Sequence, residues 1–115
     1  MAQGDHYAAM DAVLNDFDIR VDLKDHDSGY YIFKLPELET QIEIELGRYL
    51  TSQRTKFKTS HAIHTPSQFG PYWTSRPDDD TPDYALRRAI DGIVSYYEGA
   101  IEEGHQPSES WLVEG

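Results

Sequence analysis

Hydrophobic residues change their spacing twice along this chain of 115 residues. Between residues 19 and 64 they recur at alternate positions, as in "QIEIEL", whereas in residues 6–17 and 81–104 they lie three or four positions apart. Alternation is typical of a strand with one buried face, and the longer spacing is typical of an amphipathic helix. We therefore predict a single α+β domain over residues 1–115, in which a short N-terminal helix and a long C-terminal helix pack on an antiparallel sheet of three to four strands.

Four strands are expected in the alternating part, at residues 19–24, 30–35, 37–46 and 54–64. The third has a second interpretation, because four of its apolar residues also fit one face of a helix: Leu38, Ile42, Leu46 and Leu50. Strict alternation favours the strand. If the third and fourth strands form a hairpin, the glutamates of one can face the basic residues of the other.

The long C-terminal helix has clear end signals. Thr81 is expected to cap it, Pro82 to be its first residue and Gly104 to end it. Aspartates at 78–80 and at Asp83 would complement the positive end of the helix dipole. Its apolar face is expected to consist of Leu86, Ile90, Ile93, Val94, Tyr97 and Ile101. The tail is expected to dock on the core through Trp111, Leu112 and Val113.

Charge is distributed unevenly, with 21 acidic and 10 basic residues giving a net charge of −11. Residues 1–50 carry −7 (11 acidic, 4 basic) and residues 78–115 carry −8 (10 acidic, 2 basic), while residues 51–77 hold 4 basic residues and no acid. Two explanations stay open: neutralisation within the fold, which is the commoner outcome, or a basic binding surface. The net field repels nucleic acid and anionic membranes and favours basic protein partners.

Composition further limits the kind of protein and the compartment in which it works. Cysteine is absent, which excludes disulfides and thiolate metal sites and agrees with a reducing compartment. No apolar run approaches the ~18 residues of a membrane span, and the start "MAQGDHYAAMD" lacks the basic and apolar regions of a signal peptide. We expect a cytoplasmic protein without membrane association.

Motifs that carry chemistry are few. His61 and His64 have a spacing that chelates a metal on a helix, but on a strand, the structure expected there, they point to opposite faces. The turn Asp25-His26-Asp27 lacks the ligand spacing of a calcium loop. No serine lies in a G-x-S-x-G elbow, and no glycine-rich phosphate loop is present. We expect no metal, no cofactor and no catalytic residue; a small enzyme without a recognisable motif stays as an alternative.

The segment "SQFGPYWTSRPDDD" (residues 67–80) combines the residue types that dominate binding interfaces. Tyr72, Trp73 and Arg76 are the expected anchors for a protein partner. Acidic residues beside them and on the long helix would attract a basic partner: Asp78, Asp79, Asp80, Glu98, Glu102 and Glu103. One alternative is that the aromatic rings only cover the open end of the sheet. Another is a single-stranded nucleic-acid platform in residues 51–77, which the net charge disfavours.

The C-terminal third, "GPYWTSRP…DYALRRAIDGIVSYYEGAIEEGHQPSESWLV", resembles small accessory proteins of phages and mobile elements. The size, the acidity and the absence of cysteine are similar to those of anti-CRISPR and anti-restriction inhibitors. That resemblance implies binding to a basic nuclease or nucleoprotein complex of the host, action in the host cytoplasm, and blocking of DNA binding in the manner of a DNA mimic. The group has no shared catalytic motif, so the resemblance assigns no further residue.

Overall fold

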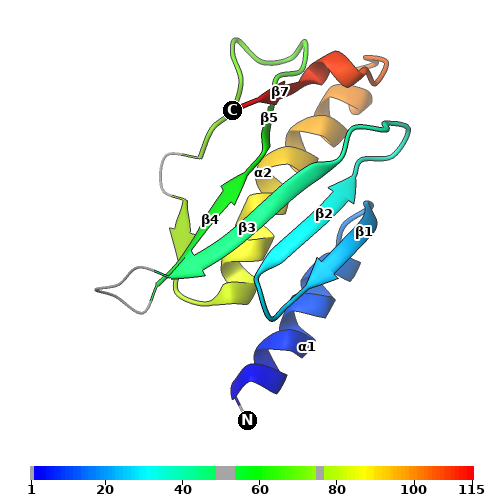
Figure 1. The fold of residues 1–115 in the computed structure, drawn as a ribbon. Helices are drawn as coiled ribbons and strands as arrows, with labels where there is room; N and C mark the ends of the chain where they lie inside the picture. Colours follow the sequence, from blue (N-terminus) through cyan, green and yellow to red (C-terminus); the bar gives the residue numbers. More distant parts are fainter. Residues whose placement is uncertain (1, 49–53, 75–76) are drawn as a thin grey trace.

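The computed structural model describes residues 2–48, 54–74 and 77–115, in which two helices cover one face of an antiparallel sheet (Figure 1). The elements in chain order are α1 (Ala2–Asn15), β1 (Arg20–Asp25), β2 (Tyr30–Lys34), β3 (Ile42–Arg48), β4 (Thr55–Thr59), β5 (His61–Ile63), β6 (Asp78–Asp79), α2 (Pro82–Glu102), a 3₁₀ turn (Glu109–Trp111) and β7 (Leu112–Glu114). The predicted α+β class is confirmed. Within these ranges, no helix has both the length and the apolar character needed to cross a membrane.

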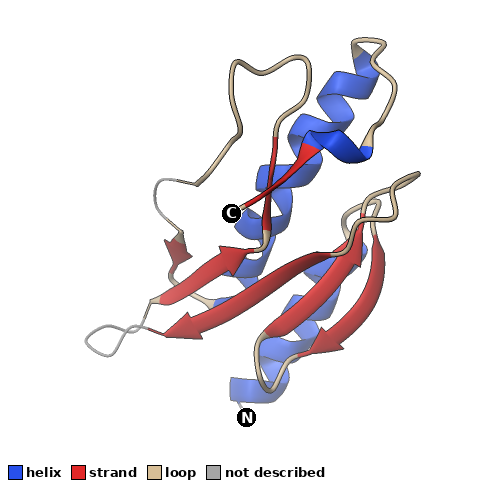
Figure 2. Ribbon diagram, turned by 45° about the horizontal axis from the view of Figure 1, so that its top comes forward, coloured by secondary structure: helices blue, strands red, loops and turns tan. Residues whose placement is uncertain are grey.

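The main sheet has five strands in the order β1-β2-β3-β4-β6, and β5 pairs with β7 in a separate two-stranded sheet (Figure 2). The predicted number of three to four strands is therefore too low. The strands that were not predicted are short: β6 has two residues and β7 has three. Segments of this length contain too few alternating positions to be recognised from sequence.

Ser60 divides the predicted fourth strand into β4 and β5. Its N–H donates to the carbonyl of Glu43 (2.9 Å), and its hydroxyl accepts from the N–H of Glu43 (2.8 Å). Its own carbonyl accepts from the N–H of Gly115 (3.2 Å). The chain thus leaves the main sheet and enters the small one across a single residue.

The third strand and the first helix have other boundaries than the sequence predicted. The third strand begins at Ile42 instead of residue 37, because Glu37 has a positive φ of 68°, which no extended strand permits. Leu38 is still 2% exposed, so it packs on the core from a loop. The first helix spans Ala2–Asn15 instead of residues 6–17.

Alternate residues of the central strands point toward the helices and form the core, because successive strand side chains point to opposite faces. These buried residues are Tyr31, Phe33, Ile42, Ile44 and Phe57. The matching face of α2 consists of Ala85, Leu86, Ala89, Ile90, Ile93, Val94, Tyr97 and Ala100. Ile101 was expected on this face but is 38% exposed, because it lies at the margin of the apolar stripe in the last turn.

The ends of α2 follow the predicted signals. The hydroxyl of Thr81 accepts from the N–H of Tyr84 (3.5 Å), and Pro82 is the first helical residue. Gly104 has a φ of 95°, a conformation that favours glycine and ends the helix. The three aspartates that precede Thr81 were expected to serve the helix start. Asp78 and Asp79 form β6, and all three aspartates take part in ion pairs.

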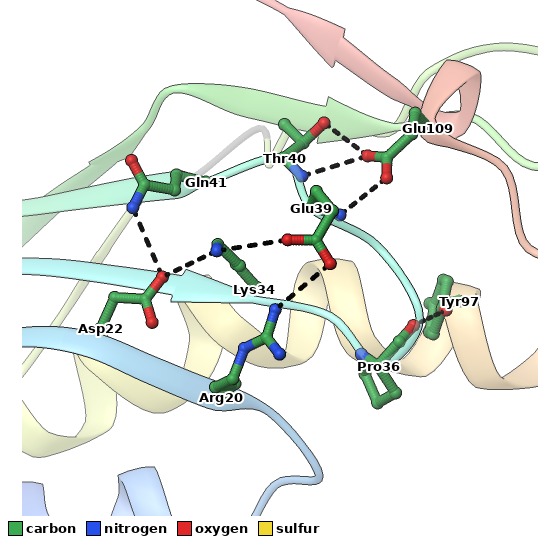
Figure 3. A network of polar contacts seen from close by, with 9 residues as sticks. All are labelled: Arg20, Asp22, Lys34, Pro36, Glu39, Thr40, Gln41, Tyr97 and Glu109. Carbon is green, nitrogen blue, oxygen red and sulfur yellow. Dashed lines mark hydrogen bonds and ion pairs between the residues drawn. The ribbon is translucent and has the colours of Figure 1, made fainter.

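The predicted docking of the tail is confirmed for Trp111 and Leu112, which are buried. A carboxylate fixes the tail to the loop between β2 and β3 (Figure 3): Glu109 accepts from the N–H of Glu39 (2.6 Å) and from both the N–H (3.1 Å) and the hydroxyl (2.6 Å) of Thr40. These donors hold the pKa of Glu109 below its ordinary value, with the Thr40 hydroxyl the largest cause.

Candidate functional site: an aromatic loop beside an acidic helix end

A loop between β5 and β6 rises from the small sheet (Figure 1), and hydrogen bonds of Gln68 fix its shape. The side-chain carbonyl of Gln68 accepts from the N–H of Thr65 (2.8 Å). Its side-chain amide donates to the carbonyls of Ile63 (3.0 Å) and Gly70 (3.3 Å). Thr65 itself is 1% exposed, so the base of the loop belongs to the folded core. We call residues 64–74 the aromatic loop.

Phe69 lies between two residues of this hydrogen-bonded framework, yet its ring is fully exposed. Phe69 lies within the segment that the sequence singled out (residues 67–80), but it was not among the expected anchors. The signal that could have found it is the sequence Phe69-Gly70-Pro71, because glycine and proline favour a turn and leave the preceding side chain at its tip. The ring of Phe69 is therefore available for contact with a partner.

Tyr72 is both packed and exposed. Its N–H donates to the carbonyl of Ile63 (3.0 Å), and its ring lies 4.9 Å from the ring of Tyr96 on α2. A Cβ at Gly92 would come within 3.2 Å of the Tyr72 ring, so glycine makes room for it. The residue is 36% exposed. Part of the ring therefore covers α2, and the remainder is available for contact.

Trp73 follows the same pattern. It is 45% exposed, and its ring lies against Gly115, where an added Cβ would be 2.8 Å from the indole. The third expected anchor, Arg76, lies outside the described residues. The structure thus brings Phe69, Tyr72 and Trp73 together on one loop.

The aspartates before α2 are paired within the fold. Arg54 contacts Asp78 (2.7 Å) and Asp80 (2.6 Å), and the bond to Asp78 is the main reason that the pKa of Arg54 is raised. Arg88 lies 3.8 Å from Asp79 and donates to the backbone carbonyl of Asp78. These three aspartates were expected to attract a partner, but two arginines of the same chain already neutralise much of their charge.

The other acidic residues of the expected set lie at the C-terminal end of α2. Glu98, Glu102 and Glu103 are all exposed, and Glu103 accepts a hydrogen bond from the hydroxyl of Ser67 in the aromatic loop. Residues 89–115 contain six acidic residues and no lysine or arginine. The loop therefore stands beside a part of the chain whose negative charge has no basic residue nearby in sequence.

The basic residues of the middle segment face acidic partners across the sheet. Lys58 lies opposite Glu45 in the β3–β4 register, as the hairpin interpretation expected, and Lys56 lies opposite Asp78 in the β4–β6 register. Together with the ion pairs of Arg54, these positions support neutralisation within the fold. They remove the main support for a basic nucleic-acid track on these strands.

A second polar cluster joins α1 to the turn between β1 and β2. His26 is hydrogen-bonded through Nε2 to Asp11 (2.9 Å) and through Nδ1 to the hydroxyl of Tyr31 (2.8 Å). Lys24 donates to the same oxygen of Asp11 (2.8 Å), and Lys24 and then His26 are the main causes of the lowered pKa of Asp11. Tyr31 is buried, which raises the pKa of its hydroxyl. Sequence analysis missed this cluster, since its members are up to twenty positions apart in the chain.

The two histidines that were considered as metal ligands lie at different places relative to β5. His61 belongs to β5 and contacts the hydroxyl of Ser60 (2.7 Å), whereas His64 follows the strand. Across residues 2–48, 54–74 and 77–115, no group of three or more potential ligands is close enough to hold a metal ion. Among the described residues, one open cavity of about 510 Å³ lies between α1 and β1, and another of about 360 Å³ lies near Tyr7 and Thr55.

Comparison of the chain with protein-family models, with curated proteins and with solved structures found no match.

Proposed function

We propose that this protein is a non-enzymatic protein-binding inhibitor that docks on a basic component of a nucleic-acid-handling complex, such as a CRISPR effector or a restriction nuclease. The aromatic loop and the acidic end of α2 form the docking surface. The observation that carries this proposal is the fully exposed ring of Phe69 on a loop fixed by Gln68.

The energetic argument concerns the cost of ordering. Burying a phenylalanine side chain that water surrounds in the free protein contributes about 1.5–3 kcal/mol. In a flexible loop, part of this free energy would be offset by the entropy lost when the loop becomes ordered on binding. Here the hydrogen bonds of Gln68 and Tyr72 already fix the backbone on both sides of Phe69. The loop is therefore suited to act as a preformed anchor.

The surroundings of the loop define the partner chemistry. The loop itself contains no lysine, arginine, aspartate or glutamate, while Glu98, Glu102 and Glu103 lie along the adjoining helix end. A complementary surface has an apolar pocket for Phe69 and lysine or arginine side chains at its rim. Such basic surfaces normally contact phosphates, so occupying one would exclude nucleic acid.

The experiment is affinity capture from nuclease-treated bacterial lysate, at about 50 mM and about 500 mM salt, with the retained proteins identified by mass spectrometry. We expect a basic nucleic-acid-binding protein that is retained at low salt, lost with Phe69→Ser and weakened by Glu98→Gln combined with Glu102→Gln. Tyr84→Ser is the matched control, because it removes a 56% exposed ring from the first turn of α2, at the opposite end of the helix.

Equal retention by wild type and Phe69→Ser would overturn the assignment of the docking surface. Retention of nucleic acid alone, without nuclease treatment, would favour the single-strand-binding alternative.

A further inference from the structure

The strand β1 forms an unpaired edge of the main sheet (Figure 1). All six of its residues are exposed, and two of them are apolar: Val21 and Leu23, each 38% exposed. Among the strands of the described residues, none lies beside the outward-facing half of its backbone N–H and C=O groups. Such an edge is a template for pairing with another strand.

A β-bulge changes which face each side chain of β1 occupies. The register passes from Val21 opposite Phe33 to Leu23 opposite Ile32, so Asp22 is the extra residue. Directly opposed residues share a face. Val21 and Lys24, which oppose the buried residues Phe33 and Tyr31, therefore both face the helices, although a regular strand would place them on opposite faces.

The remaining residues of β1 face away from the helices. Arg20 opposes Lys34 and lies 3.8 Å from Glu39 on the open face, and Asp22 contacts Lys34 there (Figure 3). Asp25 opposes Tyr30, whose hydroxyl donates to the exposed Glu43. Val21 and Lys24 thus lie on the face toward the helices, whereas the other four residues lie on the open face, which points away from the helices. The order of faces from residue 20 to residue 25 is the same when it is followed from residue 25 to residue 20.

We propose that β1 pairs antiparallel with β1 of a second copy of this protein, about a two-fold axis between Asp22 and Leu23. The symmetric face pattern allows this register, since each pair of opposed residues then shares a face. In this register, Arg20 of each copy lies opposite Asp25 of the other copy. The dimer therefore contains two such pairs, and both are attractive. The same register places Val21 opposite the aliphatic part of Lys24 on the helix face.

Neighbouring registers are less favourable, which makes the pairing specific. A shift by one residue in one direction places Arg20 opposite Lys24 and Asp22 opposite Asp22, so that like charges meet. The opposite shift pairs Asp22 with Lys24, which point to different faces of the sheet. Of these three registers, only the proposed one agrees in both charge and face.

The space beside β1 gives the second copy room on the helix side. A groove of about 510 Å³ lies between α1 and β1, and its walls include Leu14, Asn15, Val21 and Lys24. A strand added to the edge would place its own Val21 and Lys24 over this groove. Two apolar residues per copy that are now exposed, Val21 and Leu23, would be covered.

The first test is analytical ultracentrifugation of the wild-type protein from ~10 µM to ~1 mM. We expect a concentration-dependent monomer–dimer equilibrium. Arg20→Glu should weaken dimerisation by about tenfold or more, because two attractive pairs become two repulsive ones. Lys58→Glu is the control, since it makes the same change of charge on the open face of an inner strand. It should leave dimerisation unchanged.

Mixing two variants gives the sharper test. Arg20→Glu and Asp25→Lys should each be mainly monomeric alone, but a heterodimer of the two restores two attractive pairs. Asp25 also accepts from the N–H groups of Asp27 and Ser28, so circular dichroism must show that Asp25→Lys is folded. Asp25→Asn, which retains a carbonyl acceptor, provides a milder second variant that should weaken dimerisation less than Arg20→Glu.

A wild-type protein that stays monomeric over this range would overturn the proposal, as would a dimer that Arg20→Glu and Asp25→Lys both leave intact. Such a dimer would use another surface. The outcome is independent of the proposed inhibitor function, because Phe69→Ser should leave dimerisation unchanged and Arg20→Glu should leave partner capture through the aromatic loop intact.

Discussion

Aromatic and acidic residues lie beside both ends of α2, but they are packed or paired at one end and exposed at the other. At the start of the helix, Phe57 is 6% exposed beneath the guanidinium of Arg88, which lies 5.9 Å from its ring, and Asp78 is paired with Arg54. At the end of the helix, Phe69 is fully exposed and neighbouring glutamates face solvent. Arginines contact the aromatic and acidic residues in one region, whereas the corresponding residues in the other region are exposed.

This difference shows why residue type alone does not identify a binding surface. The run Asp78-Asp79-Asp80 is the more conspicuous acidic feature of the sequence, yet β4 supplies Arg54 next to it. The scattered glutamates of the helix end are less conspicuous. No lysine or arginine lies near them in the sequence, since residues 89–115 contain neither.

The largest effect is expected from removing the buried ring. Phe57→Ala should lower the free energy of unfolding by about 3–5 kcal/mol, because it leaves a cavity between the sheet and α2. Phe69→Ala should leave it unchanged within about 0.5 kcal/mol, because the ring is in water in the folded protein. Urea unfolding followed by circular dichroism measures both.

If Phe57→Ala does not fold, Phe57→Leu serves in its place with a loss of about 1 kcal/mol. A loss for Phe69→Ala comparable to that for Phe57→Ala would contradict the contrast between the two ends.

A smaller effect is expected from the charged residues. Arg54→Gln should lower the thermal midpoint, since it leaves Asp78 and Asp80 without their common cation. Glu102→Gln should leave the midpoint unchanged or raise it slightly, because it reduces repulsion among exposed acids. Differential scanning calorimetry at low and high salt checks both changes, and the effect of Arg54→Gln should shrink as salt increases.

The smallest effect is expected at Glu109. This residue follows α2 in the chain, yet its carboxylate has hydrogen-bond partners within the protein, as the aspartates before α2 do. Its pKa is lowered in the folded protein from 4.5, so its contribution to stability is fully present above pH 4.5 and is lost as the pH falls through the folded pKa. Glu109→Gln should therefore reduce stability near pH 7 and reduce the further loss on acidification. Urea midpoints measured from about pH 7 to about pH 3 test this. An unchanged pH dependence would contradict the role of Glu109 as a charged acceptor.

Much of the fold could be predicted because its signals are local. The cap at Thr81, the first helical proline and the end at Gly104 each depend on a few adjacent residues, and the structure has all three. The alternation of Ile42 and Ile44 with glutamates likewise predicted that this segment is a strand, and the structure has β3 there. By contrast, β7 exists only because the tail meets β5, some fifty residues earlier in the chain.

The candidate site could be predicted only in part. Composition drew attention to residues 67–80, which include most of the aromatic loop. The state of each residue there depends on distant partners: Tyr96 and Gly92 receive one face of Tyr72, and Arg54 neutralises Asp78. Exposure of Phe69 depends on the absence of such a partner, which no local pattern records.

The passage from β4 to β5 has a mechanical consequence. The loop that presents Phe69 follows β5 of the small sheet, and that sheet continues from the main one through Ser60. The same loop contacts α2 through Tyr72 and Ser67. A rotation of the backbone at Ser60 would therefore disturb these contacts with α2 as well as the hydrogen bonds that hold the N–H, the hydroxyl and the carbonyl of Ser60. Two separate sets of contacts thus resist a change in the direction in which Phe69 points.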